Sequence, residues 1–337
     1  MIQGGFPEQI WRSWPRRAAF LLLAWCTLAT IIRPQPEPPP AGPEEAALRF
    51  DAVALDQSDP ARRRLGALIF LEGWRISSDS PRFGGISALH VERGEAIALS
   101  DAGTLFRFAL PRAAGAGRVL LVPLPDGPGP ATRKSNRDSE SMWLEGPWLW
   151  VGFEKHNMVW RYRRADLRPM AAARPEPMRR WSANAGPEAM ARLADGRFLL
   201  LGEGLNDGRG ESDAVLFDGD PAEPATPASS LRFRRVPGYR VTDAALLPDG
   251  RLLILSRRFA WFEGLSAVLS VADVRGLTGG ATIEGREIAR LQPPLTLDNM
   301  EGLSVTVENG RTIVWLASDD NFFPLQRTLL LKFALVE

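Results

Sequence analysis

The chain has 337 residues, of which 45% are hydrophobic, so it can bury a large core in one large domain or in two smaller ones. Its formal net charge of +1 gives no strong field that would attract nucleic acid or an acidic surface. The single cysteine, Cys26, and the two histidines, His90 and His156, exclude a disulfide framework and a zinc site built from cysteine or several histidines.

The first 46 residues are typical of an export segment followed by a linker. An arginine-containing start precedes the apolar run AAFLLLAWCTLATII, and the proline-rich RPQPEPPPAGPEE follows it. We expect residues 1–32 to be a signal peptide or an N-terminal membrane anchor, and residues 33–46 to be a Pro-rich linker. We expect residues 47–337 to form one domain that is periplasmic or otherwise extracytoplasmic.

One pattern recurs along the rest of the chain: an acidic or glycine-marked lead-in, an apolar strand, a glycine-containing turn, a second apolar strand and a polar end. Its copies begin at Gly84, Asp138, Gly186, Val241 and Asp298. A period of about 50 residues suits a four-stranded propeller blade with long loops. The turns RGE, EGP, ADGR, PDGR and ENGR indicate hairpins, because Asn-Gly and Asp-Gly accept positive φ and favour type I′ turns.

These copies predict an all-β fold, a β-propeller of five blades in which each blade is a four-stranded antiparallel sheet. An N-terminal strand from the segment after Glu44 would complete the last blade and close the ring, hiding a sheet edge. Six blades would result if residues 47–80 or 205–240 form a degenerate blade. A sandwich of two sheets is the structural alternative.

Polar residues recur at two positions that a propeller would bring to one mouth of its channel. The lead-ins supply the first set, which is Glu140, Glu188, Asp243 and Glu301. The ends of the second strands supply the other set, which is Asp101, Glu154, Glu203, Arg257 and Asp319. Converging carboxylates repel one another and need a cation, protonation or arginine partners. Because these ligands are oxygens, a divalent cation such as Ca²⁺ or Mg²⁺ fits better than zinc, and we expect Ca²⁺.

Basic side chains accompany these acids near the strand ends. We expect Lys155, Arg257 and Arg327 to bind an anionic substrate such as a phosphate ester. His156 is the histidine that could act as an acid or a base. A solvated surface charge is the alternative for each arginine, and a hydrogen-bonded loop residue is the alternative for His156.

Turn chemistry is the alternative for the acids, and we expect it for Asp195 and Asp249 in their Asp-Gly turns. The segment GEGLNDGRGESD, residues 202–213, lacks the spacing of an EF-hand, and we expect it to be a loop at the channel mouth with oxygens that could bind metal. The chain contains no G-x-S-x-G elbow with a downstream Asp and His, no P-loop and no dinucleotide-binding glycine motif. Common serine hydrolases and nucleotide-binding enzymes are therefore disfavoured.

The segments FGGISAL, DSESMWL, NAGPEAMARLADGRFLLLGE and DNMEGLSV…WLASDDNFFPLQRTLLLKFAL together resemble the phytase-like family, described as having esterase-like activity of phytase. The resemblance covers about residues 65–337 and implies an exported bacterial β-propeller that hydrolyses phosphate esters. It matches the family's acidic motifs to Glu140, Glu188, Asp298, Glu301, Asp319, Asp320 and Asn321 and its first glycine pair to Gly84 and Gly85. Trp143 departs from the pattern, because the family has a smaller apolar residue there.

We therefore expect an exported, monomeric propeller that hydrolyses a small anionic or phosphorylated substrate with a divalent cation and binds no nucleic acid. The expected catalytic residues are Glu301, Asp319 and His156. The expected metal ligands are Glu140, Glu188, Asp243, Asp298, Asp320 and Asn321. Two alternatives stay open: a non-enzymatic propeller that binds a cell-envelope ligand or protein partner, and a lactonase-like propeller acting on carboxylic esters.

Overall fold

The computed structural model describes residues 42–204 and 210–336, and these residues form the all-β structure that the sequence predicts. Within these ranges the helical elements are two short 3-10 helices, η2 (Lys134–Asn136) and η3 (Glu176–Arg180). No helix in the described ranges has the length and apolar character needed to cross a membrane. The predicted signal peptide or anchor at residues 1–32 lies outside the described residues.

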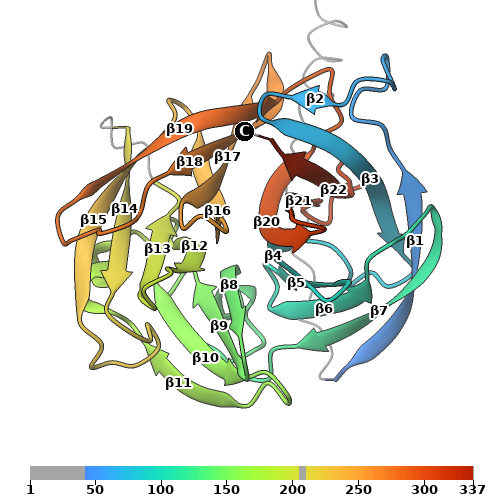
Figure 1. The fold of residues 1–337 in the computed structure, drawn as a ribbon. Helices are drawn as coiled ribbons and strands as arrows, with labels where there is room; N and C mark the ends of the chain where they lie inside the picture. The colour runs from blue at the N-terminus through green and yellow to red at the C-terminus, as the bar shows by residue number, and fades with distance from the viewer. Residues whose placement is uncertain (1–41, 205–209, 337) are drawn as a thin grey trace, which may run out of the picture. The chain divides into compact units, whose positions relative to one another are not determined.

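Antiparallel pairing joins consecutive strands in groups of four (Figure 1). The first group is β4 (Ile86–Glu92), β5 (Glu95–Ser100), β6 (Thr104–Ala109) and β7 (Gly115–Pro123). The second is β8 (Ser139–Glu145), β9 (Trp148–Phe153), β10 (Met158–Arg163) and β11 (Pro169–Ala173). The third is β12 (Pro187–Arg192), β13 (Phe198–Gly202), β14 (Glu211–Phe217) and β15 (Ala228–Arg234). The fourth is β16 (Arg240–Leu246), β17 (Leu252–Ala260), β18 (Gly264–Ala272) and β19 (Thr282–Leu291).

The last group combines the two ends of the described chain. Strands β20 (Asn299–Glu308), β21 (Arg311–Asp319) and β22 (Thr328–Leu335) pair in order, and β22 pairs with β3 (Leu68–Ser78) from the N-terminal region. Strand β1 (Glu44–Ala52) lies between β3 and β7, and the short β2 (Arg64–Leu65) pairs with β3. β1 begins inside the predicted linker, and Ala46, which precedes the predicted start of the domain, is already buried.

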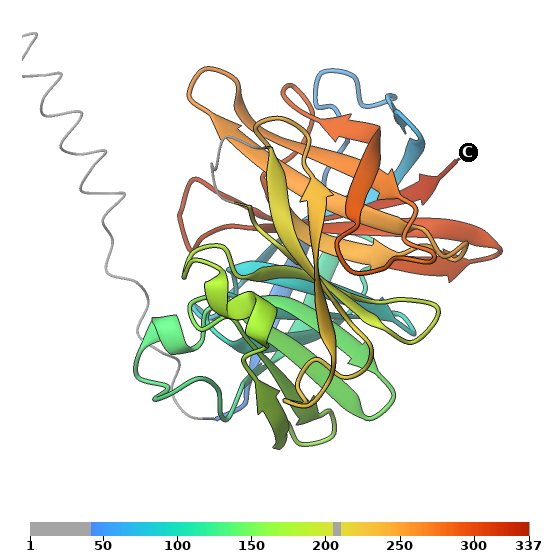
Figure 2. The same cartoon turned by 90° about the vertical axis from the view of Figure 1, so that its left-hand side faces the viewer.

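The first strands of the groups face a common centre. Strand β4 lies beside β8 and β20, β12 lies beside β8 and β16, and β16 lies beside β20 (Figure 1). The outer strands β14 and β15, drawn in yellow, are at the front of the side view in Figure 2. This arrangement of antiparallel groups around a centre is propeller-like.

Burial of both faces explains the uninterrupted apolar runs in the second strands. Every residue of β13, with the sequence FLLLG, is buried, and so are the first five residues of β17, LLILS. Each of these strands is covered on both sides by neighbouring groups, so the polar-apolar alternation of a half-exposed strand is absent. Polar residues are then confined to the strand ends, where the candidate site lies.

The hairpin turns fall where the sequence predicts them, but their backbones differ. Asn309 and Gly310 both have positive φ, as the prediction of a type I′ turn requires. In the two Asp-Gly turns only Gly196 and Gly250 have positive φ, so the type I′ prediction is wrong there. Asp195 instead accepts a hydrogen bond from the backbone N–H two residues later, which is a local turn bond that the short aspartate side chain can form.

Candidate functional site

A β-bulge recurs near the start of each inner strand and sets the geometry of the site. The register places one extra residue on β4, β8, β12, β16 and β20. These bulged residues are Ser87, Glu140, Glu188, Thr242 and Glu301. Because a bulge bends the strand and redirects a side chain, it brings a polar side chain to an equivalent place in each group.

The bulge register corrects the predicted lead-in set at the fourth copy. Thr242 is the bulged residue there, whereas the predicted Asp243 is one residue further along. Thr242 Oγ1 donates a hydrogen bond to the carbonyl oxygen of Met300, so it links β16 to β20.

The predicted second set occupies equivalent positions in all groups. In each group, the residue before the bulge pairs with a residue of the second strand, and the member of the second set comes directly after that partner. The members are Asp101, Glu154, Glu203, Arg257 and Asp319. The two sets therefore converge at one end of the propeller-like fold. We call the acids at this end the carboxylate ring, which consists of Asp101, Asp138, Glu140, Glu154, Glu188, Glu203, Glu301 and Asp319.

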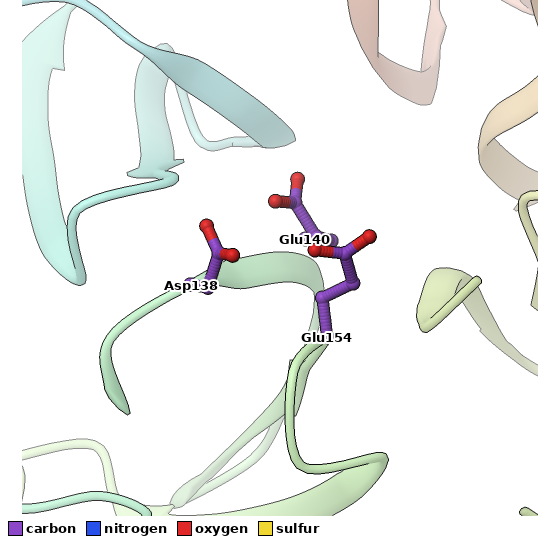
Figure 3. Close-up of side chains that lie close together, drawn as sticks. All are labelled: Asp138, Glu140 and Glu154. Atoms are coloured by element: carbon purple, nitrogen blue, oxygen red, sulfur yellow. The ribbon is translucent and has the colours of Figure 1, made fainter. Parts of the chain in front are cut away.

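Three members of the carboxylate ring lie closest together. Asp138, Glu140 and Glu154 each offer a carboxylate oxygen, and these oxygens all lie within 4.8 Å of one another (Figure 3). Asp138 precedes β8, Glu140 is the β8 bulge and Glu154 follows β9, so one hairpin supplies all three. The backbone N–H of Glu154 donates to the carbonyl oxygen of Asp138 at 2.8 Å and fixes the ends of the hairpin.

Burial and mutual repulsion shift the titration of these acids. Burial raises the pKa of Glu140 well above its usual value, and the charges of Glu188 and Glu301 raise it further. Burial raises the pKa of Glu154 to about 7 despite the nearby ammonium of Lys155. Burial also raises the pKa of Glu188, followed by repulsion from Glu203. Within residues 42–204 and 210–336, no hydrogen-bond donor satisfies the carboxylate of Glu140 or Glu188.

Two lysines border the three clustered acids. Lys155 Nζ lies 2.7 Å from Glu154 Oε2 and 3.5 Å from Asp138 Oδ2, and it also donates to Asn184 Oδ1 at 2.6 Å. Lys134 Nζ lies 2.5 Å from Asp101 Oδ2 on the neighbouring group. The lysines offset part of the negative charge but leave Glu140 without a direct partner.

Arg257 is the cationic member of the second set. Its Nε lies 2.9 Å from Glu301 Oε1, and its terminal nitrogen lies 3.9 Å from Glu203 Oε1. Asn299 Nδ2 donates to the same Glu301 oxygen at 2.8 Å. Burial raises the pKa of Glu301, while the Arg257 guanidinium lowers it and limits the net rise.

Asp319 lies beside Glu301 at the end of β21. Burial raises the pKa of Asp319 well above its usual range, and the charges of Glu301 and Asp101 add to the rise. The backbone N–H of Asn321 donates to Asp319 Oδ1 at 2.6 Å, and the side chain of Asn299 reaches the other oxygen at 3.3 Å. Asn321 itself has a positive φ of 47°, which places it in the turn after β21.

Asp243 is buried and holds neighbouring strands together. Its carboxylate accepts backbone N–H groups from Ala244 at 2.8 Å and from Leu303 at 2.7 Å. Burial raises its pKa well above the usual value, although these backbone donors oppose the rise. Both carboxylate oxygens thus accept hydrogen bonds from the main chain, and these bonds stabilise the fold.

Asp298 is likewise saturated by its neighbours. Its oxygens accept the backbone N–H groups of Asn299 at 3.0 Å and Arg327 at 3.1 Å, and the side chain of Gln326 at 3.3 Å. Arg327 Nε lies 3.3 Å from the same carboxylate, and its terminal nitrogen donates to the carbonyl oxygen of Leu297 at 2.8 Å. This network closes the β21–β22 loop onto the start of β20.

Asp320 connects the last group to the start of the first. Asp320 Oδ1 accepts the backbone N–H groups of Gly85 and Phe322, both at 3.0 Å, and Oδ2 accepts the hydroxyl of Thr328 at 2.9 Å. A Cβ atom on Gly84 would lie 2.5 Å from Asp320 Oδ1, so glycine is needed for this close approach. The first glycine pair and the last acidic cluster therefore form one structural contact.

His156 contacts an amide and not one of the clustered acids. Its Nε2 lies 2.9 Å from Asn136 Oδ1. Burial lowers its pKa, and the charge of Arg174 lowers it further. The predicted loop at residues 202–213 is described only in part, because residues 205–209 lie outside the described ranges.

Comparisons with known proteins address the family. The family model phytase-like, described as esterase-like activity of phytase, matches residues 81–322. No curated protein sequence matches the chain.

Several solved structures are similar at low sequence identity. Glutaminyl cyclase from Myxococcus xanthus has 12% identity and a TM-score of 0.43, with 80% of this chain and 97% of that chain covered. The calcium-binding protein regucalcin from Agrobacterium tumefaciens str. C58 has 13% identity and a TM-score of 0.41, with 86% and 96% covered. At TM-scores this low, neither structure bears on function. The family match spans most of the chain, and the chain therefore belongs to the phytase-like family.

Proposed function

We propose that the chain is an exported, five-bladed β-propeller that hydrolyses phosphate esters with a divalent cation bound at the carboxylate ring. The observation that carries this proposal is the cluster of Asp138, Glu140 and Glu154, whose carboxylate oxygens lie within 4.8 Å of one another. Three anionic carboxylates at that distance repel strongly unless a cation or protons neutralise them. The strand groups support five blades, with β3 completing the last blade through its pairing with β22.

The residues present fit a hard divalent cation. All three clustered ligands are carboxylates, and Glu140 has no hydrogen-bond donor of its own among the described residues. Oxygen-only ligand sets suit Ca²⁺ or Mg²⁺, and Ca²⁺ tolerates irregular geometry better, so we assign Ca²⁺. A bound divalent cation would polarise a phosphoryl oxygen and lower the pKa of a bound water.

The surrounding side chains suit an anionic substrate. Lys155 and Lys134 lie at the edge of the cluster and would neutralise phosphate oxygens. Arg257 would hold Glu301 in its ionised form, so that Glu301 could position water. Burial raises the pKa of Asp319 and favours its protonated form, so it could protonate the leaving oxygen. The contacts of Arg327 and His156 direct both side chains to other partners.

The test is an assay of the purified chain on a panel of phosphomonoesters with Ca²⁺, Mg²⁺ or chelator. We expect turnover that depends on the cation and that falls by about 100-fold or more in Glu140→Gln. Asp195→Asn is the matched control, because Asp195 is an acid in a turn, and it should keep full activity. Absence of turnover under every condition would refute the hydrolase.

A second candidate is a non-enzymatic propeller that binds a cell-envelope ligand. It is favoured by Asp243, Asp298 and Asp320, whose oxygens are occupied by main-chain or neighbouring side-chain donors. In that case Ca²⁺ would raise the melting temperature without any ester being hydrolysed. A lactone panel, run beside the phosphomonoesters, tests the lactonase-like alternative.

The localisation and the partners complete the proposal. The apolar run before the domain supports export or N-terminal anchoring, so the domain would act outside the cytoplasmic membrane. The near-zero net charge argues against nucleic acid as a partner. We assign a monomer that acts on a small phosphorylated molecule.

A further inference from the structure

A cavity lies at the end of the fold opposite the carboxylate ring. It has a volume of about 460 Å³ and is lined by the β2–β3 turn, the start of β17, the end of β18, β19 and the end of β22. The carboxylate ring lies where β12, β16 and β20 begin, whereas this cavity lies where β18 and β22 end. Its size falls in the range of small-molecule sites in proteins.

Three arginines from separate segments line this cavity, which we call the arginine pocket. They are Arg64 of β2, Arg251 before β17 and Arg286 of β19. The acid in the lining is Glu287, and Arg290 pairs with both of its oxygens at 2.9 and 2.5 Å. The pocket therefore has a net positive charge.

The arginines differ in how far they are neutralised. Arg251 pairs with Asp249 at 2.5 Å. Within residues 42–204 and 210–336, no acidic side chain forms an ion pair with Arg64 or Arg286. The pocket thus offers two guanidinium groups whose charge is not offset locally.

The floor of the pocket is fixed by backbone contacts. The N–H of Ala67 donates to the carbonyl oxygen of Ile288 at 2.9 Å, and the N–H of Val336 donates to the carbonyl oxygen of Ala67 at 2.8 Å. A Cβ atom on Gly66 would lie 2.1 Å from the same Ile288 oxygen, so this turn can approach β19 only because the residue is glycine. The pocket is preformed, which reduces the entropy lost when a ligand binds.

We propose that the arginine pocket binds the phosphate group of a phosphomonoester, at a site separate from the carboxylate ring. Arginine presents a planar fork of donors that matches phosphate oxygens, and two unpaired guanidinium groups balance the charge of nearly −2 on a phosphomonoester at pH 7. The apolar floor, formed by Val271, Ile288 and Leu335, would contact the organic part of the ligand. The phosphate could belong to a soluble metabolite or to a lipid headgroup.

Calorimetric titration of the full chain with glycerol phosphate tests the proposal. Chelator is present throughout, so that cation-dependent binding at the carboxylate ring is absent. We expect one binding event that weakens by about tenfold or more in the double variant Arg64→Ser/Arg286→Ser, and by less in Arg286→Lys. Arg311→Ser is the matched control, because Arg311 is another exposed arginine and lies outside the pocket.

Vesicles distinguish the two sources of phosphate. Sedimentation with phosphatidylcholine vesicles, with and without phosphatidic acid, should show binding that depends on phosphatidic acid and is lost in the double variant if the source is a lipid. Binding of glycerol phosphate without vesicle binding supports a soluble ligand. The proposal is overturned if neither probe binds, or if the double variant, with an unchanged melting temperature, binds the probes as the wild type does.

Discussion

Acids of the same kind behave in opposite ways at the two ends of the inner strands. In the carboxylate ring, at the end of the inner strands that we call the mouth, burial raises the pKa of Glu140, Glu188 and Asp319. In the hairpin turns at the other end, hydrogen bonds from an arginine two residues later lower the pKa of Asp195 and Asp249. The environment, and not the residue type, therefore decides whether the pKa of a carboxylate is raised or lowered.

The difference explains why the mouth, and not the hairpin turns, is a candidate for cation binding. Each turn aspartate already has a guanidinium and a backbone N–H as partners, as in the bonds of Arg251 to Asp249. At the mouth, Glu140 and Glu188 have no comparable donor among the described residues. A cation would gain most where protein partners are missing.

Removing the Arg257 guanidinium beside the carboxylate ring should have the largest effect on stability. Arg257→Gln leaves Glu301 without its guanidinium partner, while Glu203 keeps Arg240 at 3.0 Å, and we expect the free energy of unfolding to fall by about 3 kcal/mol at pH 8. The loss should be smaller at pH 5, because protonation of Glu301 removes the charge repulsion that the missing guanidinium leaves. Urea unfolding at both pH values measures this.

The matched control for this variant is Arg197→Gln in a hairpin turn. Arg197 pairs with Asp195 at 2.8 Å near the surface, where an ion pair contributes little. Equal losses in the two variants, or a loss that does not depend on pH, would contradict the contrast between the mouth and the turns.

A second prediction concerns Asp243, a buried acid that binds the main chain as the turn aspartates do. Asp243→Ala leaves the N–H groups of Ala244 and Leu303 without an acceptor, and we expect a loss of about 2 kcal/mol in urea unfolding. Asp243→Asn should cost less, because the amide keeps one acceptor oxygen and resembles the protonated acid. If the alanine variant unfolds like the wild type, Asp243 has no role in joining the strands.

The sequence predicted the all-β class because its repeat consists of apolar strands joined by glycine-containing turns. The same repeat predicted equivalent positions for the residues that end the second strand of each copy. These residues are Asp101, Glu154, Glu203, Arg257 and Asp319. The family resemblance stated from the sequence is confirmed by the match over residues 81–322.

The finer geometry could not be read from the sequence. A bulge shifts the register by one residue, so the polar residue on β16 is Thr242 although Asp243 looked equivalent. Hydrogen bonds from the backbone are also invisible in a sequence, and they occupy Asp298 and Asp320. Asp138 joins the candidate metal cluster because it lies beside Glu154, a proximity that no lead-in pattern encodes.

The pH dependence of stability, with and without Ca²⁺, should show an effect smaller than that of the Asp243 variant and larger than that of the turn variant. The pKa of Glu154 rises from 4.5 to about 7 on folding, so the folded chain holds a proton that the unfolded chain releases. In chelator, stability should therefore be full below about pH 4.5 and should fall by about 1.5 kcal/mol as the pH rises through 7, after discounting for solvent screening. Added Ca²⁺ should restore more stability at pH 8 than at pH 5.

Thermal melts at pH 5, 6, 7 and 8, with chelator or Ca²⁺, measure this dependence. Glu154→Gln should flatten the slope in chelator, because it removes the proton that is held on folding. Stability that rises between pH 5 and pH 8 in chelator would show that these acids are not buried with raised pKa values.

The smallest effect is expected in the turns, and it should have the opposite sign with pH. Asp195→Asn weakens the ion pair to Arg197 but keeps an acceptor for the Arg197 N–H, so we expect a loss below about 0.5 kcal/mol at pH 7. Because the folded pKa of Asp195 is lowered, its contribution is present above the unfolded value of 3.8 and is lost as the pH falls below it. The variant should therefore differ from the wild type at pH 7 and converge with it near pH 2, while its response to Ca²⁺ stays the same. A Ca²⁺ response that changed in this variant would place a cation in the turns and remove the distinction between the two ends of the strands.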